Sequence, residues 1–174
     1  MKIFVAGSWH KNKIKKVEKD IEKVGRLLAE NKHILVIGGG SGVSEIVARS
    51  YLKFGGRKCI VYDVAPRFRK KAGEKRKVKG HQLIKTGEDY PVRNNIMIRN
   101  CDLTIAFNGG LGVLGEILSA VNDYHESIII FEKKFNNISC IKKILNGVGK
   151  SKIFYVDNVN EIKKIINEKS KNKN

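Results

Sequence analysis

Two glycine-rich segments, each directly after an apolar run, carry the clearest chemical signal in the sequence. The first is HILVIGGGSGVSE, residues 33–45, which contains Gly38, Gly39, Gly40, Ser41 and Gly42. Glycines let the backbone approach an anion without a Cβ in the way, and the start of a following helix offers N–H donors and a partial positive charge. The segment therefore predicts a phosphate-binding turn, although a tight strand-to-helix turn packed on its neighbours would use the same glycines. It lacks the full spacing of a dinucleotide fingerprint and the lysine of a P-loop.

The second segment repeats this pattern later in the chain. In LTIAFNGGLGVLGE, residues 103–116, an apolar run ends in Asn108, Gly109, Gly110, Leu111 and Gly112, and the helix expected next carries Glu116. In an open parallel sheet, loops at the carboxyl ends of the strands share one edge and border a crevice where the strand order reverses. We therefore expect the two glycine loops to face one ligand site.

The segment DYPVRNNIMIRNCD, residues 89–102, adds a cation between the two loops. Arg93, Met97 and Asn100 are spaced by four and three residues, so they would share one face of a helix. That face would aim Arg93 toward the edge that carries Glu116. The alternative is that Arg93 pairs with a local acid such as Asp89 and that Met97 packs in the core.

The elements that would position these residues follow from hydrophobic periodicity. Apolar runs of strand length alternate with stretches of helical period. We expect strands at 2–6, 33–37, 58–64, 103–107, 127–131 and 153–156, and helices at 13–31, 42–54, 92–100, 112–124, 138–146 and 159–168. This alternation is typical of an α/β fold with a mostly parallel sheet covered on both faces. With 174 residues, one domain over 1–170 and a frayed basic tail at 171–174 are expected.

The charge is the one unusual bulk property. The chain has 35 Lys and Arg residues against 17 Asp and Glu residues, a formal net charge of +18. Such a charge favours association with phosphates, nucleotides or nucleic acid, but a solvated lysine-rich surface would give the same number. In the segment RFRKKAGEKRKVK, residues 67–79, eight residues are basic and one is acidic. We expect a long mobile loop there that acts as a lid.

Several classes of protein and site are excluded by what the sequence lacks. No run approaches the ~18 apolar residues that span a bilayer, and no signal-peptide pattern opens the chain, so we expect a cytoplasmic protein without membrane contact. Cys59, Cys101 and Cys140 are widely separated and form no CxxC or Cys/His pair. Neither a disulfide framework nor a metal site is expected.

The stretch from Arg93 to Glu116 resembles the Lonely Guy family of cytokinin-activating phosphoribohydrolases. Its relatives include the lysine-decarboxylase-like group, the sheet domain of DNA-processing protein A and molybdenum-cofactor carriers. The family pattern is an Arg, three residues, a Met, a short run to an Asp-started strand, and PGGxGTxxE. Its positions fall without a gap on Arg93, Met97, Asp102, Asn108, Gly109, Gly110, Gly112, Val113 and Glu116. The resemblance extends in order over about residues 1–131 and includes GGGSGVSE and an opening loop at Gly7 and Ser8.

This resemblance implies a Rossmann-like three-layer α/β/α domain that hydrolyses the N-glycosidic bond of a nucleoside 5′-monophosphate, without a cofactor. The family is usually a homodimer or a larger homo-oligomer, and its catalytic residues map onto Arg93 and Glu116. Glu116 would stabilise an oxocarbenium-like state and orient water, while Arg93 would hold the phosphate, the ribose or a carboxylate. The backbone amides of Gly109–Val113 would bind the 5′-phosphate, and the resemblance extends ligand contact to Gly7, Ser8, Met97, Asn108, Gly110, Leu111 and Gly112.

The chain also departs from the family pattern. Val113 replaces a Thr whose hydroxyl would bind phosphate, and Asn108 replaces a Pro. Asn94 stands where plant-like members carry Lys, and Gly115 replaces the first of two paired acids. The base, the sugar, and whether the ligand is turned over or only bound are therefore left open.

Two other functions are compatible with the sequence. A non-catalytic nucleotide or molybdenum-cofactor carrier on the same scaffold is favoured by Val113, and a nucleic-acid-handling protein is suggested by the charge and the 67–79 segment. Lysine decarboxylation is rejected because the glycine loops are better explained by phosphate. Trp9, His10 and Tyr90 are candidates to line a base pocket, or else pack in the core.

Overall fold

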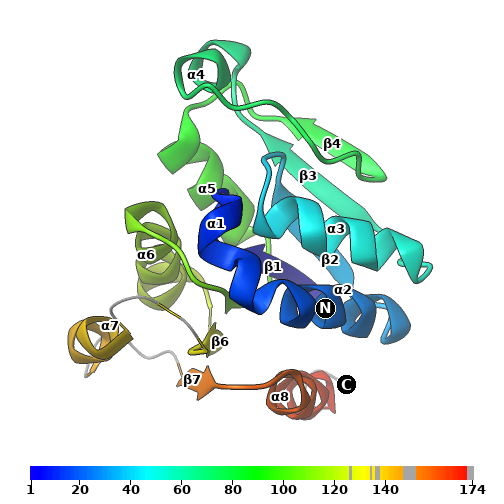
Figure 1. The fold of residues 1–174 in the computed structure, drawn as a ribbon, viewed down its shortest axis with the longest axis vertical. Helices are drawn as coiled ribbons and strands as arrows, with labels where there is room; N and C mark the ends of the chain where they lie inside the picture. The colour runs from blue at the N-terminus through cyan, green and yellow to red at the C-terminus, as the bar shows by residue number, and fades with distance from the viewer. Residues whose placement is uncertain (126, 134, 136–137, 147–151, 172–174) are drawn as a thin grey trace.

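Seven parallel strands form the centre of the fold (Figure 1), here taken from a computed structural model that describes residues 1–125, 127–133, 135, 138–146 and 152–171. The strands are β1 (Lys2–Ala6), β2 (Ile34–Gly38), β3 (Cys59–Asp63), β4 (Gln82–Lys85), β5 (Leu103–Ala106), β6 (Ser127–Phe131) and β7 (Lys152–Val156). Their order in the sheet is β4-β3-β2-β1-β5-β6-β7. Because the order reverses between β1 and β5, the loops that follow these two strands border a crevice.

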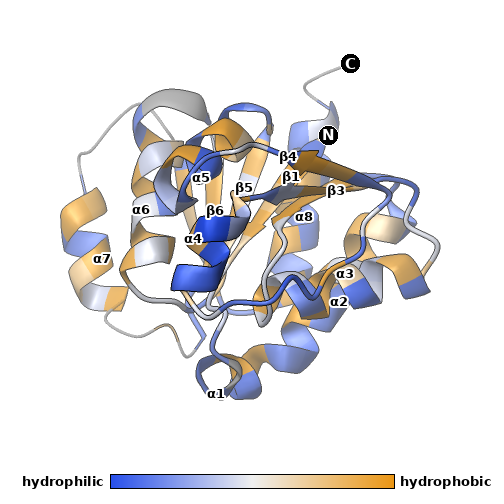
Figure 2. Ribbon diagram, turned by 90° about the horizontal axis from the view of Figure 1, so that it is seen from above, coloured by the Kyte–Doolittle hydropathy of each residue, from blue (hydrophilic) through white to orange (hydrophobic). Residues whose placement is uncertain are grey.

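Helices cover both faces of this sheet in the described residues. They are α1 (Lys11–Ile14), α2 (Glu18–Glu30), α3 (Val43–Lys53), α4 (Pro66–Lys71), α5 (Tyr90–Arg99), α6 (Leu111–Ser119), α7 (Ile138–Leu145) and α8 (Val159–Lys171). One layer contains α2, α3 and α8, and the other contains α5, α6 and α7 (Figures 1 and 2). A 3-10 turn, η1 (Lys15–Val17), joins α1 to α2, and a π-helical turn, η2 (Ala120–Tyr124), continues α6.

Two hydrophobic clusters hold the layers to the sheet. Ile3 and Val5 of β1 pack in the cluster with α2, α3 and α8, whereas the alternate residues Phe4 and Ala6 pack in the cluster with α5, α6 and α7. Successive strand residues point to opposite faces, so a strand covered on both sides must be apolar throughout. Figure 2 shows the matching distribution, with hydrophobic strands between the layers and a hydrophilic α4.

The expected α/β fold class is confirmed, and all six expected strands are present with small shifts at their ends. The sequence missed β4, a four-residue edge strand. β4 pairs with β3 alone, and its burial is low along its length, so it has no apolar run for periodicity to detect. The helix expected at 13–31 is divided by η1.

The loop expected over 67–79 is a helix in its first part, whereas its mobility stays a prediction. Its first part is helix α4, which begins with Pro66 at its first position, a placement that suits the fixed φ of proline. Farther along, Val78 is buried. Residues 74–79 have no regular secondary structure, and most of them are exposed, which accounts for their polar character.

The sequence also predicted a C-terminal tail and no membrane-spanning segment. α8 reaches Lys171, and residues 172–174 of the expected tail lie outside the described residues, so the division into a domain over 1–170 and a tail stays a prediction. Across the described ranges, no helix combines the length and the apolar character that a membrane span requires.

Candidate functional site

A cavity of about 460 Å³ lies at the carboxyl edge of the sheet, where the loops after β1, β2 and β5 meet α5 and the segment after α4. Most residues expected to contact a ligand line it: Gly7, Ser8, Gly38, Gly40, Ser41, Arg93, Gly110, Leu111, Gly112, Val113 and Glu116. Trp9, His10 and Tyr90 line it as well. The two glycine loops and the Arg93–Glu116 stretch are thus brought to one site by the reversal of strand order.

Five residues expected to contact a ligand do not line the cavity. Met97 is 1% exposed and packs in the core below α5. Gly42 precedes α3 with φ +72, where a Cβ would collide with the backbone of Ser8 and Trp9. Gly109 packs against the side chain of Val113, where a Cβ would collide with that side chain, so packing also accounts for this glycine.

The other two, Asn108 and Gly39, form hydrogen bonds that hold the loops around the cavity together. The buried Asn108 donates from Nδ2 to the backbone oxygen of Lys13 at 3.1 Å, and its own backbone oxygen accepts from the N–H of Ser8 at 3.0 Å. These bonds fix the β1 loop against the β5 loop. The Gly39 oxygen accepts from the N–H of Lys77 at 2.9 Å, which ties the β2 loop to the segment after α4.

Arg93 lies buried beneath the β2 glycine turn. Its Nη1 donates to the backbone oxygen of Tyr62 at 3.2 Å, and its guanidinium lies 5.5 Å from the ring centre of Tyr90. A Cβ on Gly38 would overlap Nη1, so a larger residue there would displace the guanidinium from its present position. Burial lowers the pKa of Arg93, while Glu116 and Glu74 oppose that shift; an arginine stays protonated in proteins despite such shifts.

The side chains of Arg93 and Asp89 do not form the ion pair that the sequence left as an alternative. The Asp89 carboxylate accepts from the N–H of Val92 at 3.0 Å and caps the start of α5. Arg93 instead keeps a buried Nε that has no hydrogen-bond partner among the described residues. A buried guanidinium N–H without a partner carries a free-energy cost that a ligand acceptor would remove.

Glu116 lies half-buried on the cavity wall, on the second turn of α6. Burial raises the pKa of its carboxyl group to about 7, against the opposing effect of the Arg93 guanidinium. Desolvation disfavours the charged form of a carboxylate, and a nearby cation favours it. A carboxyl group with a pKa near neutrality can exchange protons at physiological pH, as a general acid or base must.

The start of α6 is open toward the cavity. Gly110 precedes the helix, and a Cβ placed on Gly110 or Gly112 would meet no atom within 4 Å. Packing within the protein therefore does not require glycine at these positions, and the space beside them is available to a ligand. The first N–H groups of a helix lack intrahelical acceptors and carry a partial positive charge, so this end suits an anion.

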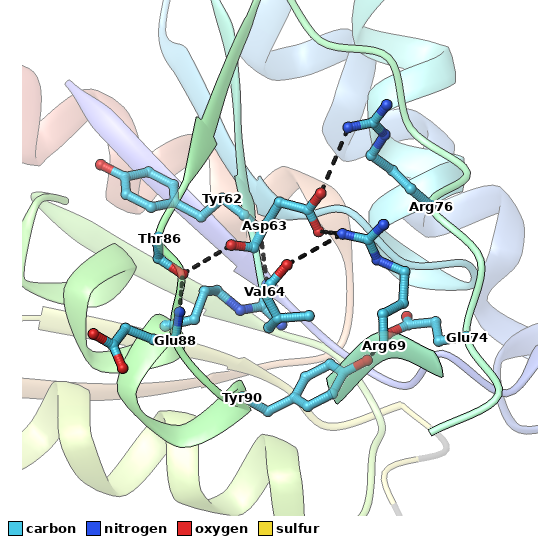
Figure 3. A network of polar contacts seen from close by, with 10 residues as sticks. Tyr62, Asp63, Val64, Arg69, Glu74, Arg76, Thr86, Glu88 and Tyr90 are labelled. Carbon is cyan, nitrogen blue, oxygen red and sulfur yellow. Dashed lines mark hydrogen bonds and ion pairs between the residues drawn. The ribbon is translucent and has the colours of Figure 1, made fainter. Parts of the chain in front are cut away.

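The segment between α4 and β4 closes one side of the cavity through Ala72 and Glu74. It is anchored by the buried Asp63 at the end of β3, which forms ion pairs with Arg69 and, at 3.5 Å, with Arg76 (Figure 3). The Glu74 carboxylate turns inward and accepts from the Tyr90 hydroxyl at 2.5 Å. The segment expected to act as a lid therefore lies beside the cavity and is held there by specific polar contacts, while its action as a lid stays a prediction.

Sequence reasoning missed several cavity residues. Lys13, Ser44, Ala72, Glu74 and Asn94 line the cavity but were not expected to contact a ligand, although all except Lys13 lie in segments that the sequence singles out. The signal that could have identified Glu74 is its position as the single acid among eight bases in residues 67–79. In the part of the chain that the structure describes, no group of three or more His, Cys, Asp or Glu side chains is placed to hold a metal ion.

Comparison with known proteins adds a family and a set of similar folds. A model of the SLOG cluster4 family matches residues 1–166. An uncharacterized protein from Archaeoglobus fulgidus is 31% identical over 101 residues, which are 58% of this chain and 62% of that protein. The matched part is thus less than two thirds of that relative's length.

Three solved structures share the Rossmann-like fold at low sequence identity. The X-ray structure of TM1055 has a TM-score of 0.80 and 22% identity, covering 96% of this chain and 98% of that one. The molybdenum cofactor carrier protein of Chlamydomonas reinhardtii has a TM-score of 0.77 and 18% identity, covering 96% of each chain. The single-stranded-DNA-binding DNA processing protein A of Helicobacter pylori has a TM-score of 0.66 and 15% identity, covering 97% of this chain and 81% of that one.

Proposed function

The chain belongs to the SLOG cluster4 family, and we propose that it binds a nucleoside 5′-monophosphate in the cavity and hydrolyses the N-glycosidic bond. The observation that carries this proposal is the placement of Glu116. Its carboxyl group, with a pKa of about 7, shares one cavity with Arg93 and with the open start of the same helix, α6.

The helix itself supplies a suitable spacing for such a substrate. Glu116 is five positions after Leu111, which is ~7.5 Å along the axis at the rise of an α-helix. Helical side chains lean toward the N-terminus, so the Glu116 carboxylate reaches back toward the anion-binding end. A phosphate at the start of α6 would therefore put the sugar of a mononucleotide beside Glu116.

The residues have distinct roles in the proposed hydrolysis. As the bond between C1′ and the base nitrogen breaks, its electron pair leaves with the base, and positive charge develops on the sugar. The Glu116 carboxylate stabilises this charge and accepts a proton from the water whose oxygen bonds to C1′. The base takes up a proton from solvent, and the products are free base and ribose 5-phosphate. Arg93 positions the substrate through its unpaired Nε–H.

A carrier on the same scaffold is the second candidate, and Val113 favours it. The Val113 side chain is 5% exposed and packs against Gly109, so the start of α6 has no hydroxyl at this position. The molybdenum cofactor carrier protein of Chlamydomonas reinhardtii resembles this chain over 96% of both lengths. If Glu116 did not act on the sugar, the backbone N–H groups at the start of α6 would still hold the phosphate of a ligand, and the protein would serve as a carrier.

We also propose a homodimer in the cytoplasm. Leu111 is 88% exposed and Trp9 is 47% exposed, and both line the cavity. Apolar side chains exposed together at the rim of a site favour contact with another molecule. Sedimentation equilibrium tests the dimer.

The test is release of free base and ribose 5-phosphate from a panel of nucleoside and deoxynucleoside 5′-monophosphates. We expect Glu116→Gln to lower kcat at least ~100-fold, the usual range for loss of a general base, and Glu168→Gln, on an exposed part of α8, to leave it unchanged. Since the carboxylate is the active form, kcat/KM for wild type should rise with pH through about 7 and level off above it.

Two results would contradict the hydrolase. Equal rates for wild type and Glu116→Gln would remove Glu116 from the reaction. Release from no member of the panel, together with a nucleotide or pterin detected by mass spectrometry in the purified protein, would establish the carrier instead.

A further inference from the structure

We propose that Glu74 is a specificity-determining residue of the cavity. Its carboxylate accepts hydrogen bonds from neutral donor groups of the ligand and rejects a second anionic group, so that the site takes mononucleotides with one phosphate in preference to diphosphates. This inference rests on the proposed function, because it assumes that the cavity binds a mononucleotide.

The Glu74 carboxylate lies between the Tyr90 ring and the β2 glycine turn. One oxygen accepts from the Tyr90 hydroxyl at 2.5 Å, and the other packs so closely on the β2 turn that a Cβ on Gly40 would overlap it. The β2 glycine turn, one of the two places where the sequence predicted a phosphate, is therefore already faced by a carboxylate of the protein. A phosphate is repelled there and is favoured at the start of α6.

Carboxylates surround the buried Arg93 guanidinium in the cavity. Glu74 and Glu116 both act on the buried Arg93, so two carboxylates already oppose the single positive charge of this guanidinium. Groups buried together interact more strongly than groups in water, because the effective dielectric constant is lower. Among the described residues that line the cavity, the Lys and Arg side chains are Lys13 and Arg93, and the carboxylates of Glu74 and Glu116 match them in number. The lining therefore offers no surplus of positive charge to a second phosphate, even though the whole chain carries +18.

The Glu74 carboxylate and the Tyr90 hydroxyl present hydrogen-bond acceptors to a ligand. A carboxylate only accepts hydrogen bonds, and the Tyr90 hydroxyl uses its one hydrogen on Glu74. Both groups are left with lone pairs to offer. They therefore select donors on the ligand, which in a mononucleotide are the ribose hydroxyls or an amino group of the base.

Glu74 is held in place by contacts of its own backbone and of its neighbours, as a residue that selects a ligand must be. Arg69 and Arg76, on either side of Glu74 in the sequence, both pair with Asp63 (Figure 3). The N–H of Glu74 donates to the Arg69 oxygen at 3.1 Å, and the N–H of Lys77 donates to the Gly39 oxygen at 2.9 Å. Glu74 is thus fixed from its own backbone and from both flanks.

The experiment measures calorimetric affinities of adenosine 5′-monophosphate and adenosine 5′-diphosphate in a Glu116→Gln background, which prevents turnover. Measurements at about 0.15 M salt screen the long-range attraction of the +18 chain for the more highly charged diphosphate. We expect at least a tenfold preference for the monophosphate, and we expect Glu74→Gln to reduce that preference to less than threefold. Tyr90→Phe, which releases the carboxylate, should reduce it as well. Glu88→Gln, an exposed change nearby, should leave it intact.

Two further ligands identify the donor. Weaker binding of 2′-deoxyadenosine 5′-monophosphate assigns the ribose 2′-hydroxyl to Glu74, and weaker binding of inosine 5′-monophosphate assigns the base amino group, provided that the loss disappears in Glu74→Ala, which has no side-chain acceptor. An unchanged preference in a folded Glu74→Gln variant would overturn the inference, as would full affinity for both of these ligands. If adenosine, guanosine, cytidine and uridine 5′-monophosphates all fail to bind, the proposed function fails instead.

Discussion

Val113 is the single residue whose change from the family pattern bears most directly on chemistry. Its side chain is buried against Gly109 at the start of α6, where a hydroxyl would reach the proposed phosphate. The backbone N–H groups of Gly110–Gly112 remain available because they belong to the helix start and not to any side chain. At this scale the site keeps its anion-binding geometry and loses one donor.

Restoring that donor gives a prediction at the residue scale. Val113→Thr is close to isosteric, and one added hydrogen bond to phosphate is worth ~0.5–1.5 kcal/mol, so we expect inorganic phosphate and mononucleotides to bind roughly 2- to 12-fold more tightly. Val43→Thr, a buried change of the same kind on α3, is the control for the effect of a new hydroxyl on folding. Calorimetry measures both, and unchanged phosphate affinity in a folded Val113→Thr would place the anion elsewhere.

The segment that joins β3 to β4 decides more of the site than any other element. It contains α4 and Glu74, and it approaches the cavity because Asp63 at the end of β3 pairs with two arginines of the segment. Thr86 bonds the Asp63 backbone oxygen at 2.8 Å and so holds the far end of the segment to the same strand. A basic sequence typical of a solvated loop thus becomes an ordered wall (Figure 3).

Removing the shared anion should release this wall. In Asp63→Asn the guanidinium of Arg69, 20% exposed, loses its ion pair, and the loss of a buried charged partner costs about 1–3 kcal/mol. We expect that decrease in the free energy of unfolding in urea, with faster hydrogen exchange confined to residues 66–79. Glu30→Gln, which breaks the exposed pair with Arg26 on α2, should cost less than ~0.5 kcal/mol. Unchanged exchange in 66–79 would show that Asp63 does not hold the segment.

At the scale of the whole molecule, the sheet order and the net charge act together. The order β4-β3-β2-β1-β5-β6-β7 brings the loops after β1 and β5 to one crevice, although the residues that line it are about a hundred positions apart in the chain. The net charge of +18 surrounds this crevice with a field that attracts anions from a distance and also strains the folded chain through self-repulsion.

Self-repulsion predicts the response of stability to salt. Raising NaCl from 0.01 to 0.3 M shortens the screening length from ~30 Å to less than ~8 Å, which weakens repulsion in the folded state. We expect the Tm to rise by about 2–4 °C per kcal/mol of relief, the usual relation for a chain of this size, and potassium chloride should match sodium chloride. Differential scanning calorimetry provides the measurement, and a flat or falling Tm would show that the charges are already balanced locally.

Taken by itself, the sequence determined the α/β alternation, the positions of six strands and the spacing from Arg93 to Glu116. These features are local: the apolar pattern of a strand reports burial on both faces, and a motif is a set of neighbours along the chain. The strand β4 was not predicted from the sequence, because two polar and two apolar residues at the edge of a sheet produce no recognisable pattern. The helix α4 was not predicted either, because its residues bury no apolar face.

The three-dimensional arrangement determines which glycines are needed for packing, which ones border open space, and where the Glu74 carboxylate lies. Gly110 and Gly112 face open space, whereas Gly38 makes room for Arg93 and Gly42 for the backbone of Ser8; all four look alike in sequence. Glu74 reaches the cavity through contacts with Tyr90 and through arginines clamped by Asp63. The partners in these contacts lie on different strands and helices, so their meeting depends on the order of the strands, which no local pattern encodes.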